Sequence, residues 1–140
     1  MPAPDALDVA VKALARRDLS EHEVVERLTR LGVPEDSRAG AVARLRQAGY
    51  LDDAKVAAER AGRLADRGKG DTAIRADLLR RGVPTEVVTR TLAELEPESV
   101  RAARLADRLG GGLRAARALA RKGFAAESIE HVLAAIAEEP

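Results

Sequence analysis

The stretch best suited to chemistry is 67–72, "RGKGDT", where glycine, lysine and threonine could together hold a phosphate. A phosphate-binding loop of this kind needs Gly-x-x-x-x-Gly-Lys followed by Ser or Thr, directly after a strand. Arg63 stands where the first glycine should be, Gly70 stands where the hydroxyl should be, and the preceding run has a helical period. We therefore predict a helix end and a flexible turn, with a new helix beginning at Asp71.

Other reactive side chains are sparse. His22 and His131 stand apart from each other, there is no cysteine, and no His-x-x-x-His spacing occurs. Each histidine is predicted to lie on the surface of a helix. Asp52 and Asp53 are adjacent, so they cannot share one helix face as a catalytic pair, and we predict that they cap a helix. The sequence predicts no enzyme, no cofactor and no metal site.

Arginines at helical spacing are the remaining candidates. Arg60, Arg63 and Arg67 stand at i, i+3 and i+7, on one face of a helix, and the spacing recurs twice downstream. Guanidinium groups suit phosphates and carboxylates, although the same pattern is also typical of a solvated face without a partner. The candidate partner- or nucleic-acid-binding residues are Arg17, Arg60, Arg63, Arg67, Lys69, Arg75, Arg80, Arg81, Arg101, Arg104, Arg108, Arg114, Arg117, Arg121 and Lys122.

Composition predicts that helices position these side chains. Of 140 residues, 46% are apolar and 34% charged, with one Phe, one Tyr and no Trp. Ala, Leu, Arg and Glu favour helices, so an all-α fold is expected. The net charge of +1 argues neither for nor against nucleic acid. The start, "MPAPDALD", is no signal peptide, no apolar run could span a membrane, and the absence of cysteine fits a reducing compartment, so we expect a cytoplasmic protein.

A threefold repeat organises the chain. Gly32, Gly82 and Gly123 align, 50 and 41 residues apart, with similar helical segments before each of them. Ser20 and Glu23 form a capping-box pattern at one helix start. We predict an elongated, curved array of three repeats, 1–50, 51–97 and 98–140, in which each repeat buries part of its apolar stripe on its neighbour. The expected helices span 5–17, 20–31, 35–48, 52–67, 71–81, 85–95, 98–109, 112–122 and 126–138.

The segments "ALARRDLSEHEVVERLTRLGVP" and "AVARLRQAGYLDDAKVAAERAGRLADRGKGDTAIRADLLRRGVP" resemble the RecX family of recombinase regulators. The resemblance is strong over residues 11–95 and looser in the third repeat. It depends on an ordered set that includes Ser20–Glu21, the Gly49–Asp53 link and Gly68–Lys69–Gly70. Val56–Ala57 stand where the family usually carries an aromatic residue, so we expect a slimmer middle helix.

The resemblance implies a small protein without a catalytic centre that binds the RecA filament on DNA. Members of this family inhibit ATP turnover, strand exchange and the coprotease role of the filament, and some bind DNA. The resemblance thus implies a part in recombination, DNA repair and the SOS response, with a monomer as the expected state. Two alternatives remain: a regulator of duplex DNA that needs no recombinase, with salt-sensitive affinity, and a helical scaffold for an acidic protein.

Overall fold

The structure, a computed structural model, describes residues 5–138. The stretch used above to judge a signal peptide lies partly outside them. The described residues form nine α-helices and no strand, and each helix ends within one residue of its expected bounds. The helices are α1 (Ala6–Arg16), α2 (Glu21–Arg30), α3 (Glu35–Gln47), α4 (Asp53–Asp66), α5 (Asp71–Arg80), α6 (Thr85–Glu94), α7 (Glu98–Arg108), α8 (Gly112–Arg121) and α9 (Ala126–Glu138). Within residues 5–138 no helix has both the length and the apolar character that a bilayer span requires.

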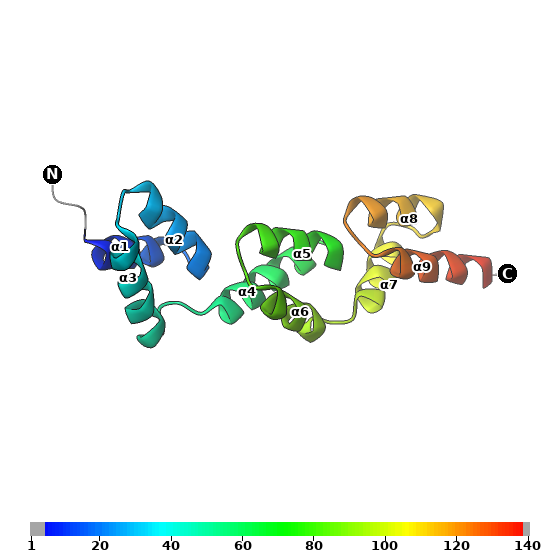
Figure 1. The fold of residues 1–140 in the computed structure, drawn as a ribbon. Helices are drawn as coiled ribbons and strands as arrows, with labels where there is room; N and C mark the ends of the chain where they lie inside the picture. Colours follow the sequence, from blue (N-terminus) through cyan, green and yellow to red (C-terminus); the bar gives the residue numbers. More distant parts are fainter. Residues whose placement is uncertain (1–4, 139–140) are drawn as a thin grey trace.

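The helices are grouped in threes along one axis (Figure 1). We call α1–α3 repeat 1, α4–α6 repeat 2 and α7–α9 repeat 3. Every helix pair in extensive contact lies within one of these triplets. The triplets follow one another in a row, and the first and last described helices lie at opposite ends of the molecule. The expected all-α, elongated repeat array is confirmed, while its curvature stays a prediction.

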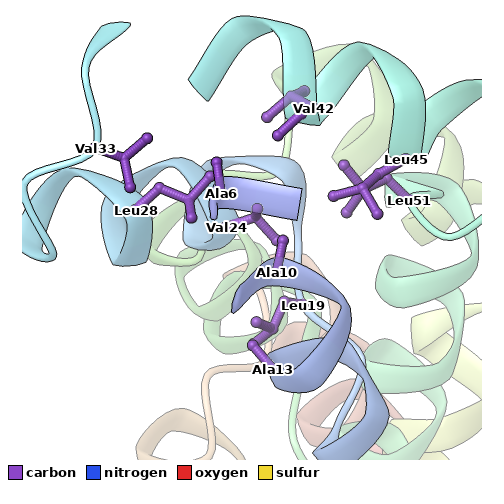
Figure 2. Packing of buried hydrophobic residues seen from close by; sticks show 11 residues of the cluster. Ala6, Ala10, Ala13, Leu19, Val24, Leu28, Val33, Val42, Leu45 and Leu51 are labelled. Carbon is purple, nitrogen blue, oxygen red and sulfur yellow. The ribbon is translucent and has the colours of Figure 1, made fainter. Parts of the chain in front are cut away.

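Each repeat has a hydrophobic core of its own. Leu28 and Leu45 are buried in repeat 1, Leu78 in repeat 2 and Leu119 in repeat 3. Figure 2 shows the first core, where short aliphatic side chains meet between three helices. Among the described residues each buried cluster takes its helical members from one triplet. Ala73 and Phe124 nevertheless approach glycines across the second junction. The expectation of an apolar stripe shared between neighbours stays a prediction.

Local capping explains why the helix bounds were predictable. Glu23 N–H donates to Ser20 Oγ at 3.1 Å, and Ser20 N–H donates to the Glu23 carboxylate at 2.9 Å, as the capping-box pattern predicts. Pro34, Pro84 and Pro97 occupy the N-cap positions of α3, α6 and α7. Proline suits a helix start, because its φ is fixed and its missing N–H is not needed there.

The glycine-rich turn after α4 joins repeat 2 to repeat 3. Gly68 ends α4 with a φ of 83°, and Asp71 begins α5, as predicted. The main chain of this turn is, however, hydrogen-bonded to repeat 3. Gly70 N–H donates to the Lys122 carbonyl at 2.9 Å, and Thr72 N–H donates to the Gly123 carbonyl at 3.0 Å. The stretch that resembled a phosphate loop is therefore a main-chain docking point between repeats.

Replacing Gly70 with alanine is expected to lower the free energy of unfolding by about 1–3 kcal/mol, because the two loops must separate. A Cβ at this position would lie 2.4 Å from both the main-chain N and the Cα of Phe124. Gly62→Ala is the matched control: Gly62 lies inside α4 with open space around its Cβ position, so alanine should stabilise the helix by about 0.5–1 kcal/mol. Urea denaturation measures both effects, and changes of the same sign would contradict the docking role.

Candidate partner-binding surface

The side chains considered for catalysis have structural places. His22 is exposed in the first turn of α2, and its Nε2 lies 3.1 Å from the carboxylate of Glu26. His131 is exposed on α9. Asp52 accepts a hydrogen bond from Lys55 N–H at 3.2 Å and so caps α4, as predicted. Within residues 5–138 no three His, Cys, Asp or Glu side chains are grouped to hold a metal ion.

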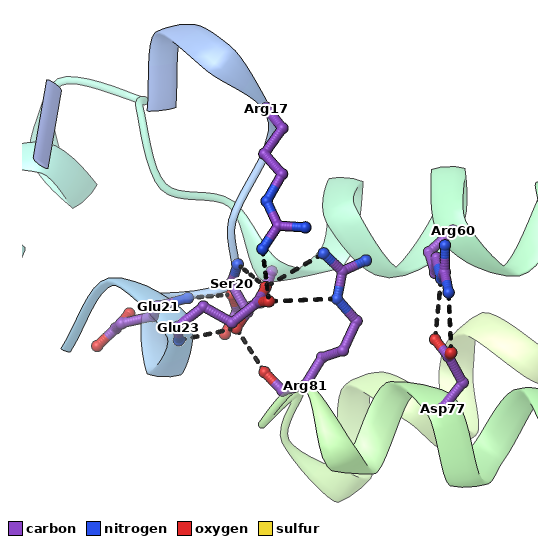
Figure 3. Close-up of polar contacts among 8 residues, drawn as sticks. Arg17, Ser20, Glu21, Glu23, Arg60, Asp77 and Arg81 are labelled. Atoms are coloured by element: carbon purple, nitrogen blue, oxygen red, sulfur yellow. Dashed lines mark hydrogen bonds and ion pairs between the residues drawn. The ribbon is translucent and has the colours of Figure 1, made fainter. Parts of the chain in front are cut away.

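Repeat 1 meets repeat 2 where the start of α2 faces the end of α5 (Figure 3). Ser20 Oγ donates to the Arg81 carbonyl at 2.5 Å. The Glu23 carboxylate lies 3.4 Å from the Arg81 guanidinium and 3.8 Å from that of Arg17. Two candidate arginines from different repeats thus converge on one acid, and both are engaged within the chain.

Repeat 2 meets repeat 3 through the equivalent elements, the start of α5 and the end of α8. Arg101, from α7, is buried at this second junction. Its guanidinium donates to the Glu96 carbonyl at 2.9 Å and to the Lys69 carbonyl at 3.1 Å, and it pairs with the Asp71 carboxylate. Arg101 therefore fastens two repeats to each other.

At each internal junction, an acid at the start of the following repeat caps the second helix of the repeat before it. Asp53, the first residue of α4, accepts from Glu21 N–H at 2.9 Å. Glu98, the first residue of α7, accepts from Asp71 N–H at 2.6 Å and from the Ser128 hydroxyl at 2.6 Å. Burial raises the pKa of Asp53, although its hydrogen bond from Glu21 opposes the rise. The sequence predictions included neither bridge, although both acids are the first residue of their helix.

These junctions place the second helices α2, α5 and α8 in one row (Figure 1). At each junction the N-terminus of one helix faces the C-terminus of the next, through Ser20 and Arg81 and then through Gly70 and Lys122. The positive and negative ends of the helix dipoles therefore meet, which is favourable. Side chains at equivalent positions of these three helices therefore recur once in every repeat along the row.

The predicted ridge of arginines divides between the interior and the surface. Arg60 makes two 3.0 Å hydrogen bonds to the Asp77 carboxylate and is partly buried, so it, like Arg101, acts within the chain. Lys69, Arg81 and Lys122 are also partly buried. Three exposed members have acidic neighbours: Arg17 lies 3.8 Å from Glu23, Arg104 lies 2.7 Å from Glu96 and Arg80 lies 3.7 Å from Asp77. The exposed candidates are Arg17, Arg63, Arg67, Arg75, Arg80, Arg104, Arg108, Arg114, Arg117 and Arg121.

Two sets of exposed arginines follow the repeat. The first-helix set lies at the ends of α1, α4 and α7 and consists of Arg17, Arg67 and Arg108. The second-helix set lies in the last turns of α2, α5 and α8 and consists of Arg30, Arg80 and Arg121. Arg30 was absent from the predicted residues, although it stands two places before Gly32 as Arg80 and Arg121 stand before their glycines. The surface therefore offers positive charge at the period of the array.

Known proteins share both the sequence and the fold of this chain. A family model described as "RecX, first three-helix domain" matches residues 6–45. "Regulatory protein RecX" of Mycolicibacterium smegmatis is 33% identical over 93 residues, which are 66% of this chain and 50% of the relative. That of Chromohalobacter salexigens is 36% identical over 91 residues, 65% of this chain and 60% of the relative. The matches thus span about half of these relatives' lengths.

Crystal structures of RecX proteins have a similar fold. The crystal structure of RecX from Lactobacillus salivarius has a TM-score of 0.79 at 18% identity and covers 91% of this chain and 92% of that one. A second crystal structure, of a regulatory protein RecX, has a TM-score of 0.75 at 22% identity and covers 91% of this chain and 69% of that one. The chain belongs to the RecX family. The family resemblance seen in the sequence is therefore confirmed.

One intra-repeat ion pair of this RecX-family chain makes its stability depend on pH. Hydrogen bonds from Arg60 hold the pKa of Asp77 below its ordinary value, although burial opposes this shift. The folded state thus binds this proton less tightly than the unfolded state does. The resulting stabilisation is fully present above the ordinary carboxyl pKa and is lost as the pH falls through the lower folded value.

Replacing Asp77 with asparagine is therefore expected to lower the free energy of unfolding by about 1 kcal/mol at neutral pH, since the pair is only partly buried. In acid, below the ordinary carboxyl pKa, the stabilisation by the ion pair is progressively lost, and the difference between the two proteins should shrink. Urea denaturation in both conditions measures this difference. An equal loss at neutral and acidic pH would mean that the ion pair does not cause the effect.

Proposed function

We propose that this RecX-family chain is a non-enzymatic regulator that binds the RecA–DNA filament in the cytoplasm and inhibits recombinase activity, including ATP turnover and strand exchange. The relatives named above are called regulatory proteins, which supports a regulatory rather than a catalytic role. The observation that carries the proposal is the recurrence of exposed arginines once per repeat along an extended array.

A periodic array of cations suits a periodic anionic partner. Guanidinium groups form strong, geometrically defined bonds with carboxylates and phosphates, and a filament presents the same acidic groups at every subunit. Arg114 and Arg117 extend the exposed basic face of α8 beyond the two threefold sets. Each arginine contributes little alone, so the affinity comes from several repeats binding at once.

The test uses RecA filaments assembled on single-stranded DNA with ATP. We expect the full chain to sediment with these filaments, to sediment much less with DNA alone, and to reduce ATP turnover at near-stoichiometric ratios. No reduction at a several-fold excess would overturn the proposal. Retention of duplex DNA without RecA, with affinity falling steeply as salt rises, would instead support the alternative of a recombinase-independent DNA-binding regulator.

A further inference from the structure

Two junction faces in this chain have no partner within the described residues. At both internal junctions, the start of a second helix approaches a left-handed glycine closely: His22 lies against Gly82 and Ala73 lies against Gly123. Gly32 is the equivalent glycine of repeat 1, and the space around its Cβ position is open. The start of α8, at Gly112, is open as well. Repeat 1 thus presents one half of a junction, and repeat 3 presents the other half.

We propose that these two faces bind each other between copies of this chain, so that α8 of one copy docks end to end on α2 of the next. The interface would continue a geometry that the chain already uses twice. The occupant of the outer face of repeat 1 is thus the outer face of repeat 3 of a second copy. Such an interface is heterologous, and its repetition produces head-to-tail rows of molecules.

The two faces are complementary in their helix dipoles and in their exposed apolar side chains. The first turn of α8 contains no acid and has no side-chain cap, so its N-terminal end is uncompensated, while α2 would supply the negative end of its dipole. Leu113 stands two residues after the N-cap of α8, as His22 does in α2, and would therefore lie against Gly32 of the second copy. Leu31, the C-cap of α2, adjoins that glycine. Leu113 and Leu31 are 56% and 49% exposed, and docking would cover both.

The two faces also carry opposite charges, although not at the positions of the internal pair. At the second internal junction Asp71 on the second helix pairs with Arg101 on the first helix of the next repeat, and the equivalent positions at the proposed interface are the uncharged Gly112 and Ala10. The charged groups on the two faces are Arg114 in the first turn of α8, and Asp5 and Asp8 at the start of α1, where Asp8 also pairs with Lys12. The interface has no equivalent of the Glu23–Arg81 pair, so we expect association to be weaker than at the internal junctions.

Cysteine trapping tests the orientation, because the natural chain contains no cysteine. Leu31→Cys and Leu113→Cys proteins are mixed under mild oxidation, and the Leu31–Leu113 heterodimer should exceed either homodimer, since a disulfide requires closely opposed residues. Leu79→Cys, exposed on α5 away from both faces, is the control partner. A heterodimer yield no greater than with this control would overturn the proposal.

Sedimentation equilibrium of the full chain measures association directly. The average mass should rise with protein concentration up to about 1 mM, which would replace the expectation of a monomer. Leu113→Glu should weaken association at least about tenfold, because it places a carboxylate against Leu31 and the negative C-terminal end of α2, yet an acid in the first turn suits the α8 dipole and preserves folding. Leu133→Glu, on α9, should associate like the natural chain. A constant monomer mass, or equal association of both variants, would overturn the proposal.

Discussion

Replacing Arg101 with alanine is expected to lower the free energy of unfolding by about 2–4 kcal/mol, the largest effect of any single arginine in this chain. The substitution leaves the Glu96 and Lys69 carbonyls and the Asp71 carboxylate without their donor. Arg101 itself is only 8% exposed, so water cannot easily replace these bonds. Urea denaturation measures the loss, and hydrogen exchange should place it at the junction of repeats 2 and 3.

Arg104→Ala is the matched control, one turn further along α7. Arg104 is exposed and pairs only with the exposed carboxylate of Glu96, so its loss should have little effect on unfolding. Arg101→Lys should lower the free energy of unfolding by an intermediate amount, because lysine keeps the charge but not the forked donors of arginine. Equal effects of Arg101→Ala and Arg104→Ala would show that the junction does not depend on the buried guanidinium.

This comparison also separates two ways of losing function. Arg101 and Arg104 look alike in the sequence, since both belong to one helical arginine pattern. A loss of filament binding in Arg101→Ala would follow from a changed angle between repeats and would accompany the loss of stability. A loss in Arg108→Ala, with stability unchanged, would instead indicate a direct contact, because Arg108 is exposed.

The helices could be predicted because their signals are local. The Ser20–Glu23 capping box and the left-handed glycines Gly32, Gly82 and Gly123 depend on neighbours a few residues away, and each ends or begins a helix where expected. The repeat register followed from the same glycines. The all-α array was therefore predictable without any knowledge of contacts between repeats.

The burial of individual arginines could not be predicted from helical spacing. Ala10, Arg60 and Arg101 share one register position and are buried, partly buried and buried, whereas Arg63 at the next position is exposed. A helix pattern indicates the face of a side chain, but the adjacent repeat determines how deeply that face is covered. The alanines of repeat 1 give no guide, because Ala13 is buried like Ala10, yet its equivalents Arg63 and Arg104 are exposed.

The junctions were harder still to predict. Several of their bonds join main-chain atoms, such as Gly70 N–H and the Lys122 carbonyl, and leave no side-chain pattern in the sequence. Gly70 was interpreted as part of a flexible turn because glycine usually indicates freedom. Its actual requirement is the close approach of Phe124, which lies 54 residues away in the chain and becomes a neighbour only after folding.

Reversing the second-helix set, with Arg30, Arg80 and Arg121 all changed to glutamate, is expected to raise the concentration for half-maximal inhibition of RecA ATP turnover by about 100-fold. Each reversal removes one exposed contact and adds a repulsion, together about 1 kcal/mol or roughly fivefold. The three residues lie in separate repeats, so their effects should add. Each single reversal should raise the half-maximal concentration about fivefold.

The control variant has the same change in net charge, but at other exposed positions. Lys12, Arg44 and Arg90 are exposed outside both arginine sets, and changing all three to glutamate shifts the net charge equally. We expect less than about a threefold change, because uniform charge acts mainly through screened long-range attraction. Equal losses in the two triple variants would mean that the partner senses bulk charge. A loss confined to the second-helix set would mean that it binds arginines at the period of the repeats.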